Sequence, residues 1–215
     1  MYIMKKIIGI SLVILNLNNC TMAQNENSSM AKNENSMMDK NEQMIDVFKS
    51  KDETTINISA DKLWKIIGKG FADYDEWATI VDHSKGKGMG KFDGAPVDER
   101  VCNVNGQGAN EVVEKLLQYS DKEMHLKYEA VQGMHQMMSK AINKFTVVRL
   151  PKNKSKIVVN MMWGVYGPLD DEMSKMMEGN MNSIMEVFLN DIKVYAETGK
   201  VSQVKQKRLD ELAKM

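Results

Sequence analysis

Apolar residues recur at helical spacing over residues 170–197, near the C-terminal end of the chain. They follow one another at intervals of three or four positions, which places them on one face of a helix: Met173, Met177, Met181, Ile184, Phe188, Ile192 and Tyr195. Acidic residues 170–172 stand where the helix dipole favours negative charge, and Gly199 supplies a stop. The pattern predicts one amphipathic helix that is roughly 40 Å long at about 1.5 Å per residue.

The residues before this helix have the pattern of successive strands. Strand-like runs are separated by short, turn-rich connections: 98–104, 110–119, 123–132, 141–150 and 156–166. Short connections imply antiparallel neighbours. Because so long a helix needs a broad partner surface, we expect an α+β fold in which a curved antiparallel sheet of about six to seven strands wraps around it and leaves a cavity between them.

A strand and two short helices are predicted ahead of the main run of strands. Residues 54–59 alternate in the manner of a strand. Ser59 or Asp61 can cap a helix that continues to Ile67. A second short helix or turn is expected over residues 71–77.

The N-terminal 23 residues have the pattern of a secretory signal peptide. Two lysines precede the apolar run 7–15, which is too short to span a bilayer because a span needs about 20 residues. We expect cleavage after Ala23, which makes residues 1–23 the signal peptide and the mature protein periplasmic or secreted. The alternative is lipidation of Cys20, which would anchor a lipoprotein to a membrane by its tether.

A polar tract with a short repeat follows the apolar run. The sequence Asn-Glu-Asn-Ser at 25–28 returns at 33–36, and the tract offers little to bury. We therefore expect residues 24–48 to form a disordered tether. The folded domain is expected over residues 49–199, and residues 200–215 form a C-terminal tail for which a helix is an open alternative.

Length and charge narrow the functional classes. A chain of 215 residues allows one domain of ordinary size with extensions. Its 29 acidic and 29 basic residues balance, and a chain without net positive charge gives no support to electrostatic binding of nucleic acid. We expect a monomer with no nucleic-acid partner and no membrane span.

Motifs that mark common catalytic chemistries are missing. His83, His125 and His135 lie in different segments without metal-ligand spacing, so neither a metal site nor a cofactor is expected. The glycines within 86–94 lack the Gly-Lys-Ser/Thr ending of a phosphate-binding loop and indicate a flexible turn between strands. Cys102 lies in a strand-like run, which favours a small buried thiol over a nucleophile.

The element order resembles the START-like superfamily, the SRPBCC or polyketide cyclase/dehydrase-like proteins of the helix-grip fold. The resemblance covers residues 53–197. Its opening segment is the run Ile56-Asn57-Ile58-Ser59-Ala60-Asp61-Lys62-Leu63-Trp64-Lys65-Ile66-Ile67, followed by Phe71, Tyr74 and Trp77. The strand residues that support it are Arg100-Val101-Cys102, Glu114-Lys115-Leu116, Leu126-Lys127-Tyr128 and Val159-Asn160-Met161-Met162-Trp163. Proteins of this fold include lipid carriers, plant hormone receptors, allergens and aromatase/cyclases. The resemblance therefore implies the fold but does not choose the function.

Strand alternation identifies the side chains that should face the long helix. It places Leu126, Tyr128 and Ala130 on one face of their strand, and Met161 and Trp163 on one face of the last strand. The residues expected to line the cavity are Arg100, Leu126, Tyr128, Met161, Trp163, Met177, Met181, Ile184, Met185 and Phe188. Tyr128 and Trp163 either line this cavity or complete the core, and both alternatives stay open.

Two further features bear on the cavity. Arg100 and Glu114 either face the interior as a charged pair or face solvent across neighbouring strands, and the solvated pair is favoured because buried ion pairs are costly. The chain has 20 methionines, several of them on the long helix. Thioether side chains adapt to irregular apolar ligands, although a compositional bias of the source explains the enrichment equally well.

These observations favour binding of a small hydrophobic or amphipathic molecule by an exported protein. The first alternative is a cyclase/dehydrase-like enzyme in which Tyr128 or Glu114 moves a proton. The second alternative is a ligand-free interaction module at the cell envelope.

Overall fold

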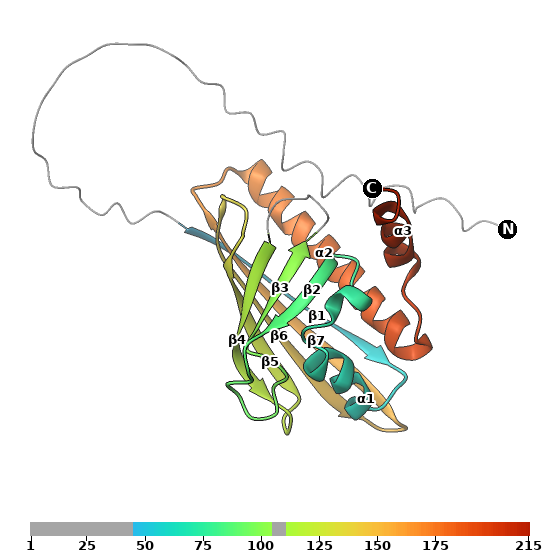
Figure 1. The fold of residues 1–215 in the computed structure, drawn as a ribbon. Coiled ribbons are helices and arrows are strands. Elements are labelled where there is room, and N and C mark those ends of the chain that lie inside the picture. Colours follow the sequence, from blue (N-terminus) through green and yellow to red (C-terminus); the bar gives the residue numbers. More distant parts are fainter. Residues whose placement is uncertain (1–44, 105–110) are drawn as a thin grey trace, which may run out of the picture. The chain divides into compact units, whose positions relative to one another are not determined.

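The computed structural model describes residues 45–104 and 111–215 of the chain. Figure 1 shows one long helix lying across a curved antiparallel sheet, which is the α+β helix-grip arrangement that the sequence predicts. The predicted signal peptide, Cys20 and residues 24–44 of the predicted tether lie outside the described residues. Within them, no helix combines the length and the apolar character that a membrane crossing requires.

Seven strands form the sheet in the order β1-β7-β6-β5-β4-β3-β2. Their bounds are β1 Ile45–Ile56, β2 Val81–Lys87, β3 Glu99–Val104, β4 Glu111–Ser120, β5 His125–Gln132, β6 Met138–Leu150 and β7 Lys154–Tyr166. All neighbouring strands are antiparallel. From β2 to β7 each strand lies beside its successor in sequence, as the short connections predict.

Strand β1 begins earlier than the sequence pattern indicates. It runs from Ile45 to Ile56 and pairs with β7 along its whole length, from Tyr166 to Ser155. The prediction that residues 45–48 belong to the tether was therefore wrong, as was the start of the first strand at residue 54. The middle of β1 is polar and buries few side chains. Backbone hydrogen bonds to β7 therefore hold this part of the edge strand in place.

The two short helical segments lie where they were predicted, but one strand was missed. Helix α1 Ala60–Trp64 continues as the π-helical turn η3 Lys65–Lys69, and η4 Tyr74–Glu76 is a single 3₁₀ turn. Strand β2 was not predicted, and only its end, at residues 86–87, overlaps the passage that was predicted to be a flexible turn. Among its residues only Val81 is buried, so the hydrophobic pattern gave no sign of a strand.

Helix α2 Asp171–Thr198 matches the predicted long helix. Asp170 is its N-cap and accepts a hydrogen bond from the backbone N–H of Met173 at 2.8 Å. Gly199 ends the helix with a φ of 67°, a conformation that glycine adopts without strain. The buried face of α2 comprises Met177, Met181, Met185, Phe188, Leu189, Asp191 and Ile192.

The C-terminal segment is helical and belongs to the folded domain. Helix α3 Gln203–Leu212 begins at the N-cap Ser202, whose hydroxyl also donates to the carboxylate of Asp191 on α2. Lys205 is fully buried and donates to the carbonyl of Val81 at 2.7 Å. Because these bonds attach α3 to both α2 and β2, residues 200–215 are part of the domain, and the predicted domain end at residue 199 was wrong.

Candidate functional site

Aromatic rings fill the space between the sheet and the C-terminal half of α2. Six buried rings contact one another there: Phe71, Tyr74, Trp77, Tyr128, Phe145 and Phe188. The ring centroids of Phe145 and Phe188 lie 5.1 Å apart, and those of Trp77 and Phe188 lie 5.0 Å apart. These are contact distances for paired aromatic rings. Leu126, Tyr128 and Phe188, which were expected to line a cavity, belong to this packed core.

Arg100 lies among these rings. Its guanidinium carbon is 4.0 Å from the centroid of Tyr74, 4.6 Å from that of Phe71 and 5.0 Å from that of Tyr128. One guanidinium nitrogen donates to the carbonyl of Phe71 at 3.0 Å. The electron-rich faces of the rings and this carbonyl compensate part of the hydration that the cation loses on burial.

Glu114 neutralises the charge of Arg100 inside the protein. The two residues are opposite each other on β3 and β4, and the Arg100 side chain is 2% exposed against 12% for Glu114. The prediction that this pair faces solvent was therefore wrong. Burial is the largest single influence and lowers the pKa of Arg100. The attraction of Glu114, reinforced by Tyr128, Cys102 and Tyr74, raises the pKa by more in total, so the net pKa is raised and the guanidinium stays charged.

The side chains beside the ion pair are held in their protonated forms. Burial, reinforced by the charge of Glu114, raises the pKa of Tyr128 well above its ordinary value. Burial likewise raises the pKa of Cys102 to about 11, although the charge of Arg100 opposes the shift. The thiol lies 3.6 Å from the Ser84 hydroxyl oxygen and 3.7 Å from a carboxylate oxygen of Glu114. Cys102 is thus a buried thiol and not an activated nucleophile, as predicted.

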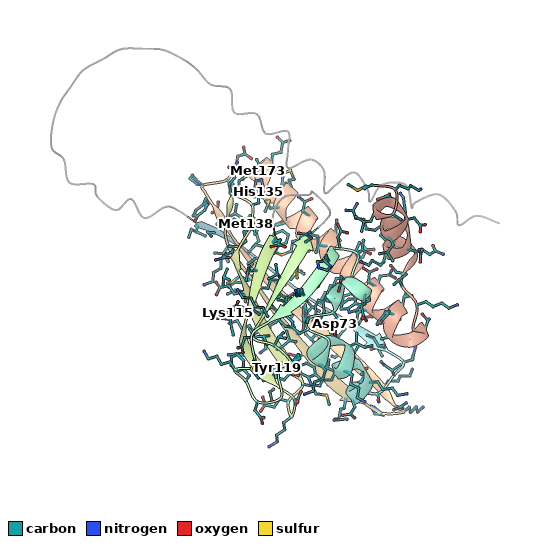
Figure 2. The ribbon with its side chains drawn as sticks, in the orientation of Figure 1. Asp73, Lys115, Tyr119, His135, Met138 and Met173 are labelled. Atoms are coloured by element: carbon teal, nitrogen blue, oxygen red, sulfur yellow. The ribbon has the colours of Figure 1, made fainter. Side chains whose placement is uncertain are left out.

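The other half of the interior, beneath the N-terminal half of α2, is lined by methionines. Met177, Met181 and Met185 are all buried in the common core, and Ile184 is half-buried against it. Met181 also borders a hollow of about 390 Å³ that opens between α2 and the residues around Phe48 of β1. Figure 2 shows Met173 of α2 at the same end of the domain as His135 and Met138.

Two alanines lie on the strands between Trp163 and the Arg100–Glu114 pair. Phe48 is paired in register with Trp163, which is half-buried, and Trp163 is paired with Ala141 of β6. On the next strands Ala130 is paired with Glu114, and Glu114 with Arg100. A tryptophan and a buried ion pair therefore stand at the two sides of a shallow stretch of sheet that carries two alanines.

Asn143 is a polar residue of this region that sequence reasoning missed. It lies between Tyr128 and Met161 in the strand register, both of which are buried on the inner face. Its side-chain oxygen is buried and has no hydrogen-bond partner among the described residues. Strand alternation alone would have found it, since residues 141, 143 and 145 share one face of β6.

The histidines lie apart from this region and from one another. His83 and His135 are exposed, and His125 is half-buried beside Glu123. Among the residues that the structure describes, no group of three or more histidine, cysteine, aspartate or glutamate side chains is arranged to hold a metal ion.

A family model described as polyketide cyclase / dehydrase and lipid transport matches residues 47–197 of the sequence. No curated protein matches the chain.

Solved structures with a similar fold come from several bacteria. XoxI from Bacillus cereus is 16% identical, with a TM-score of 0.53, and the match covers 67% of this chain and 92% of that one. A START superfamily protein from Mycobacterium smegmatis is 15% identical over 67% of this chain and 96% of its own, with a TM-score of 0.52. The Zhui aromatase/cyclase from Streptomyces sp. R1128 is 11% identical over 73% and 100%, with a TM-score of 0.55. At these identities the likeness shows the fold alone.

Proposed function

Because this chain belongs to the family of polyketide cyclase, dehydrase and lipid-transport proteins, we propose that it binds a small hydrophobic or amphipathic molecule between the sheet and the N-terminal half of α2. One observation carries the proposal: methionines form the buried face of α2 in this half of the interior, whereas the other half is packed with aromatic rings. The binding region comprises Met177, Met181, Met185, Met161, Trp163, Ala130, Ala141 and Asn143.

Methionine side chains can fill a binding region in the absence of a ligand and move aside when a ligand enters. Its unbranched thioether side chain takes several conformations at little cost and fits irregular apolar shapes. Ala130 and Ala141 each carry a single methyl group, so the inner face of the sheet has little bulk at these two positions. An apolar ligand in this space would gain about 25 cal/mol for each Å² of apolar surface it removes from water.

The polar groups at the border of the region favour a ligand with one polar end. A hydroxyl or amide group on the ligand could donate to the unpartnered oxygen of Asn143. A buried acceptor without a partner costs about 1–3 kcal/mol, and a ligand that supplies the missing bond recovers part of that cost. The binding region thus selects an amphipathic molecule over a plain hydrocarbon.

Native mass spectrometry of the full chain, followed by solvent extraction of what co-purifies, tests this proposal. We expect one reproducible apolar or amphipathic compound, and less of it in an Asn143→Leu variant because the polar anchor is gone. A protein that carries nothing and takes up no member of a lipid and aromatic panel would instead favour the ligand-free interaction module.

A cyclase-like reaction is the second candidate, because Tyr128 lies within the electrostatic influence of Glu114 and Arg100. The raised pKa keeps Tyr128 protonated, so its hydroxyl would act by donating a hydrogen bond to a substrate carbonyl and not as a base. Turnover of a panel of aromatic and polyketide-like ketones would support this candidate if Tyr128→Phe abolished it and the variant remained folded.

Export of the mature protein is also proposed. It is supported by the order of two lysines, a short apolar run and Ala23 at the N-terminus. An exported protein with one apolar site would carry or sense its ligand outside the cytoplasm.

A further inference from the structure

The face of the sheet that points away from α2 carries a hollow ringed by lysines. Its volume is about 410 Å³, and four of its lining residues are Lys49 and Lys51 of β1, Lys127 of β5 and Lys144 of β6. Between them lie the half-buried side chains of Ile142 and Met162. Four long cationic side chains thus stand around a shorter apolar floor.

These four lysines have no acidic partner within the described part of the chain, whereas their neighbours do. Glu53 on β1 is paired with Lys156 at 2.9 Å, and Glu129 on β5 is paired with Lys140 at 3.7 Å. The nearby acids are therefore already neutralised by other lysines. The positive charge of the ring is left uncompensated although the whole chain is balanced.

The arrangement of the ring works against the stability of the sheet. Lys127 and Lys144 are directly opposite each other on β5 and β6, and the same row continues through Asn160 to Lys51. Like charges at directly opposed positions destabilise a sheet. Lysines on the edge strand β1 are explained by protection against edge-to-edge pairing, but Lys127 and Lys144 lie on interior strands where that explanation fails.

We infer that this lysine-ringed face docks on an anionic phospholipid surface. Strands lie about 4.8 Å apart, so the cations spread over roughly 14 Å from β1 to β5, wider than one phosphate and suited to several headgroups. The apolar floor between the cations suits a lipid interface, where basic and apolar side chains act together. A nucleic acid fits less well because the floor between the lysines is mainly apolar, with Ser50 and Asn160 as its uncharged polar residues.

This inference is independent of the proposed ligand, which would lie on the other face of the sheet. Either proposal can fail without the other. Together they would describe a domain that meets a membrane with one face of its sheet and holds an apolar molecule against the opposite face.

Co-sedimentation with vesicles tests the docking surface. The full chain is mixed with vesicles of phosphatidylcholine alone, or with equal parts of phosphatidylcholine and phosphatidylglycerol. We expect binding to the anionic vesicles only, weakened by added salt. Replacing Lys127 and Lys144 with glutamine should reduce the affinity roughly 30-fold, because one lysine near an anionic surface contributes about fivefold.

The matched control is Lys140→Gln/Lys156→Gln, which removes the same charge from the same face but takes lysines that already have acidic partners. We expect it to reduce affinity far less. Thermal melts should show that Lys127→Gln/Lys144→Gln folds at least as stably as the wild type, because the opposed charges are gone. Equal loss in both double variants, equal binding to neutral vesicles, or binding to DNA without binding to vesicles would each overturn the inference.

Discussion

Arg100 on β3 and Glu114 on β4 face each other inside the protein, with 2.5 Å between the guanidinium Nε and the carboxylate Oε2. A buried ion pair is sustained only when its remaining hydrogen-bonding groups are satisfied. The carbonyl of Phe71 and the faces of three aromatic rings meet that requirement for Arg100. The pair thus joins the aromatic core to the edge of the proposed binding region.

Replacing Arg100 with methionine should lower the free energy of unfolding by about 3–5 kcal/mol, because the charge of Glu114 would stay buried without its partner. The double variant Arg100→Met/Glu114→Leu should recover a large part of that loss. Urea denaturation of the three proteins measures both effects. A double variant no more stable than Arg100→Met would show that lost packing, and not the unpaired charge, causes the damage.

Asp191 should make stability depend on pH. Burial raises its pKa above the ordinary 3.8, although Ser202 and the backbone N–H of Thr79 donate to its carboxylate. The pKa of Asp191 is higher in the folded protein than in the unfolded chain. Its contribution to the stability of the fold is therefore fully present below the pKa of the unfolded chain and is lost as the pH rises through the pKa of the folded protein. We expect the stability of the wild type relative to Asp191→Asn to fall as the pH is raised from 3.8.

Asp61 provides a control because its effect on stability should depend on pH in the opposite direction. Its hydrogen bond to Arg149 lowers its pKa, so its contribution is present above the ordinary pKa and is lost as the pH falls. Urea unfolding of Asp61→Asn and Asp191→Asn across a pH series should therefore give opposite slopes relative to the wild type. A pH-independent difference for Asp191→Asn would contradict the assignment.

Local signals made α2 and strands β3 to β7 predictable. The methionine and phenylalanine spacing of α2, its N-cap Asp170 and its stop at Gly199 are all within the segment itself. The strands were found because buried residues such as Leu126 and Tyr128 alternate with polar ones. Each of these patterns depends on nearest neighbours along the chain.

The remaining features depend on partners that are distant in sequence. Residues 45–48 are a strand because β7 pairs with them, and α3 belongs to the domain because Lys205 reaches Val81. The burial of Arg100 depends on rings from residues 71–74 packing over β3. For the same reason the sequence identified the inner face of the sheet correctly but not the division of the interior into an aromatic half and a methionine half.

Cys102 should be unreactive in the folded protein. The thiol is 1% exposed, and burial raises its pKa to about 11, so little thiolate is available to attack a reagent at neutral pH. In a Cys20→Ser variant Cys102 is the sole cysteine. We expect an aromatic disulfide reagent to label this variant only after a denaturant is added. Rapid labelling of the native protein would contradict the buried position.

The mature N-terminus should be Gln24. The apolar run 7–15 has the length of a signal peptide, and Ala23 suits the residue before a cleavage site. Intact-mass measurement of protein recovered outside the cytoplasm tests this expectation. A diacylated chain that begins at Cys20 would replace it with membrane anchoring.

Substitutions of Met181 test whether a ligand can displace its side chain or whether the side chain is fixed in the core. It is 2% exposed, yet it borders the hollow beside Phe48, so a larger side chain has a direction in which to extend. Added bulk in a filled core costs about 1–3 kcal/mol. We expect Met181→Trp to remain folded near wild-type stability and to lose the co-purifying compound, because the indole would occupy the space that the ligand needs.

Truncation at the same position gives the complementary measurement. Removing a large buried side chain typically costs about 2–5 kcal/mol, and we expect that full cost for Ile192→Ala, which lies on the same helix face and is fully buried. Met181→Ala should cost less because Met177 and Met185, one turn to either side, can move into the space. If Met181→Trp unfolds the domain and Met181→Ala costs as much as Ile192→Ala, the methionines are fixed packing and the ligand site is not there.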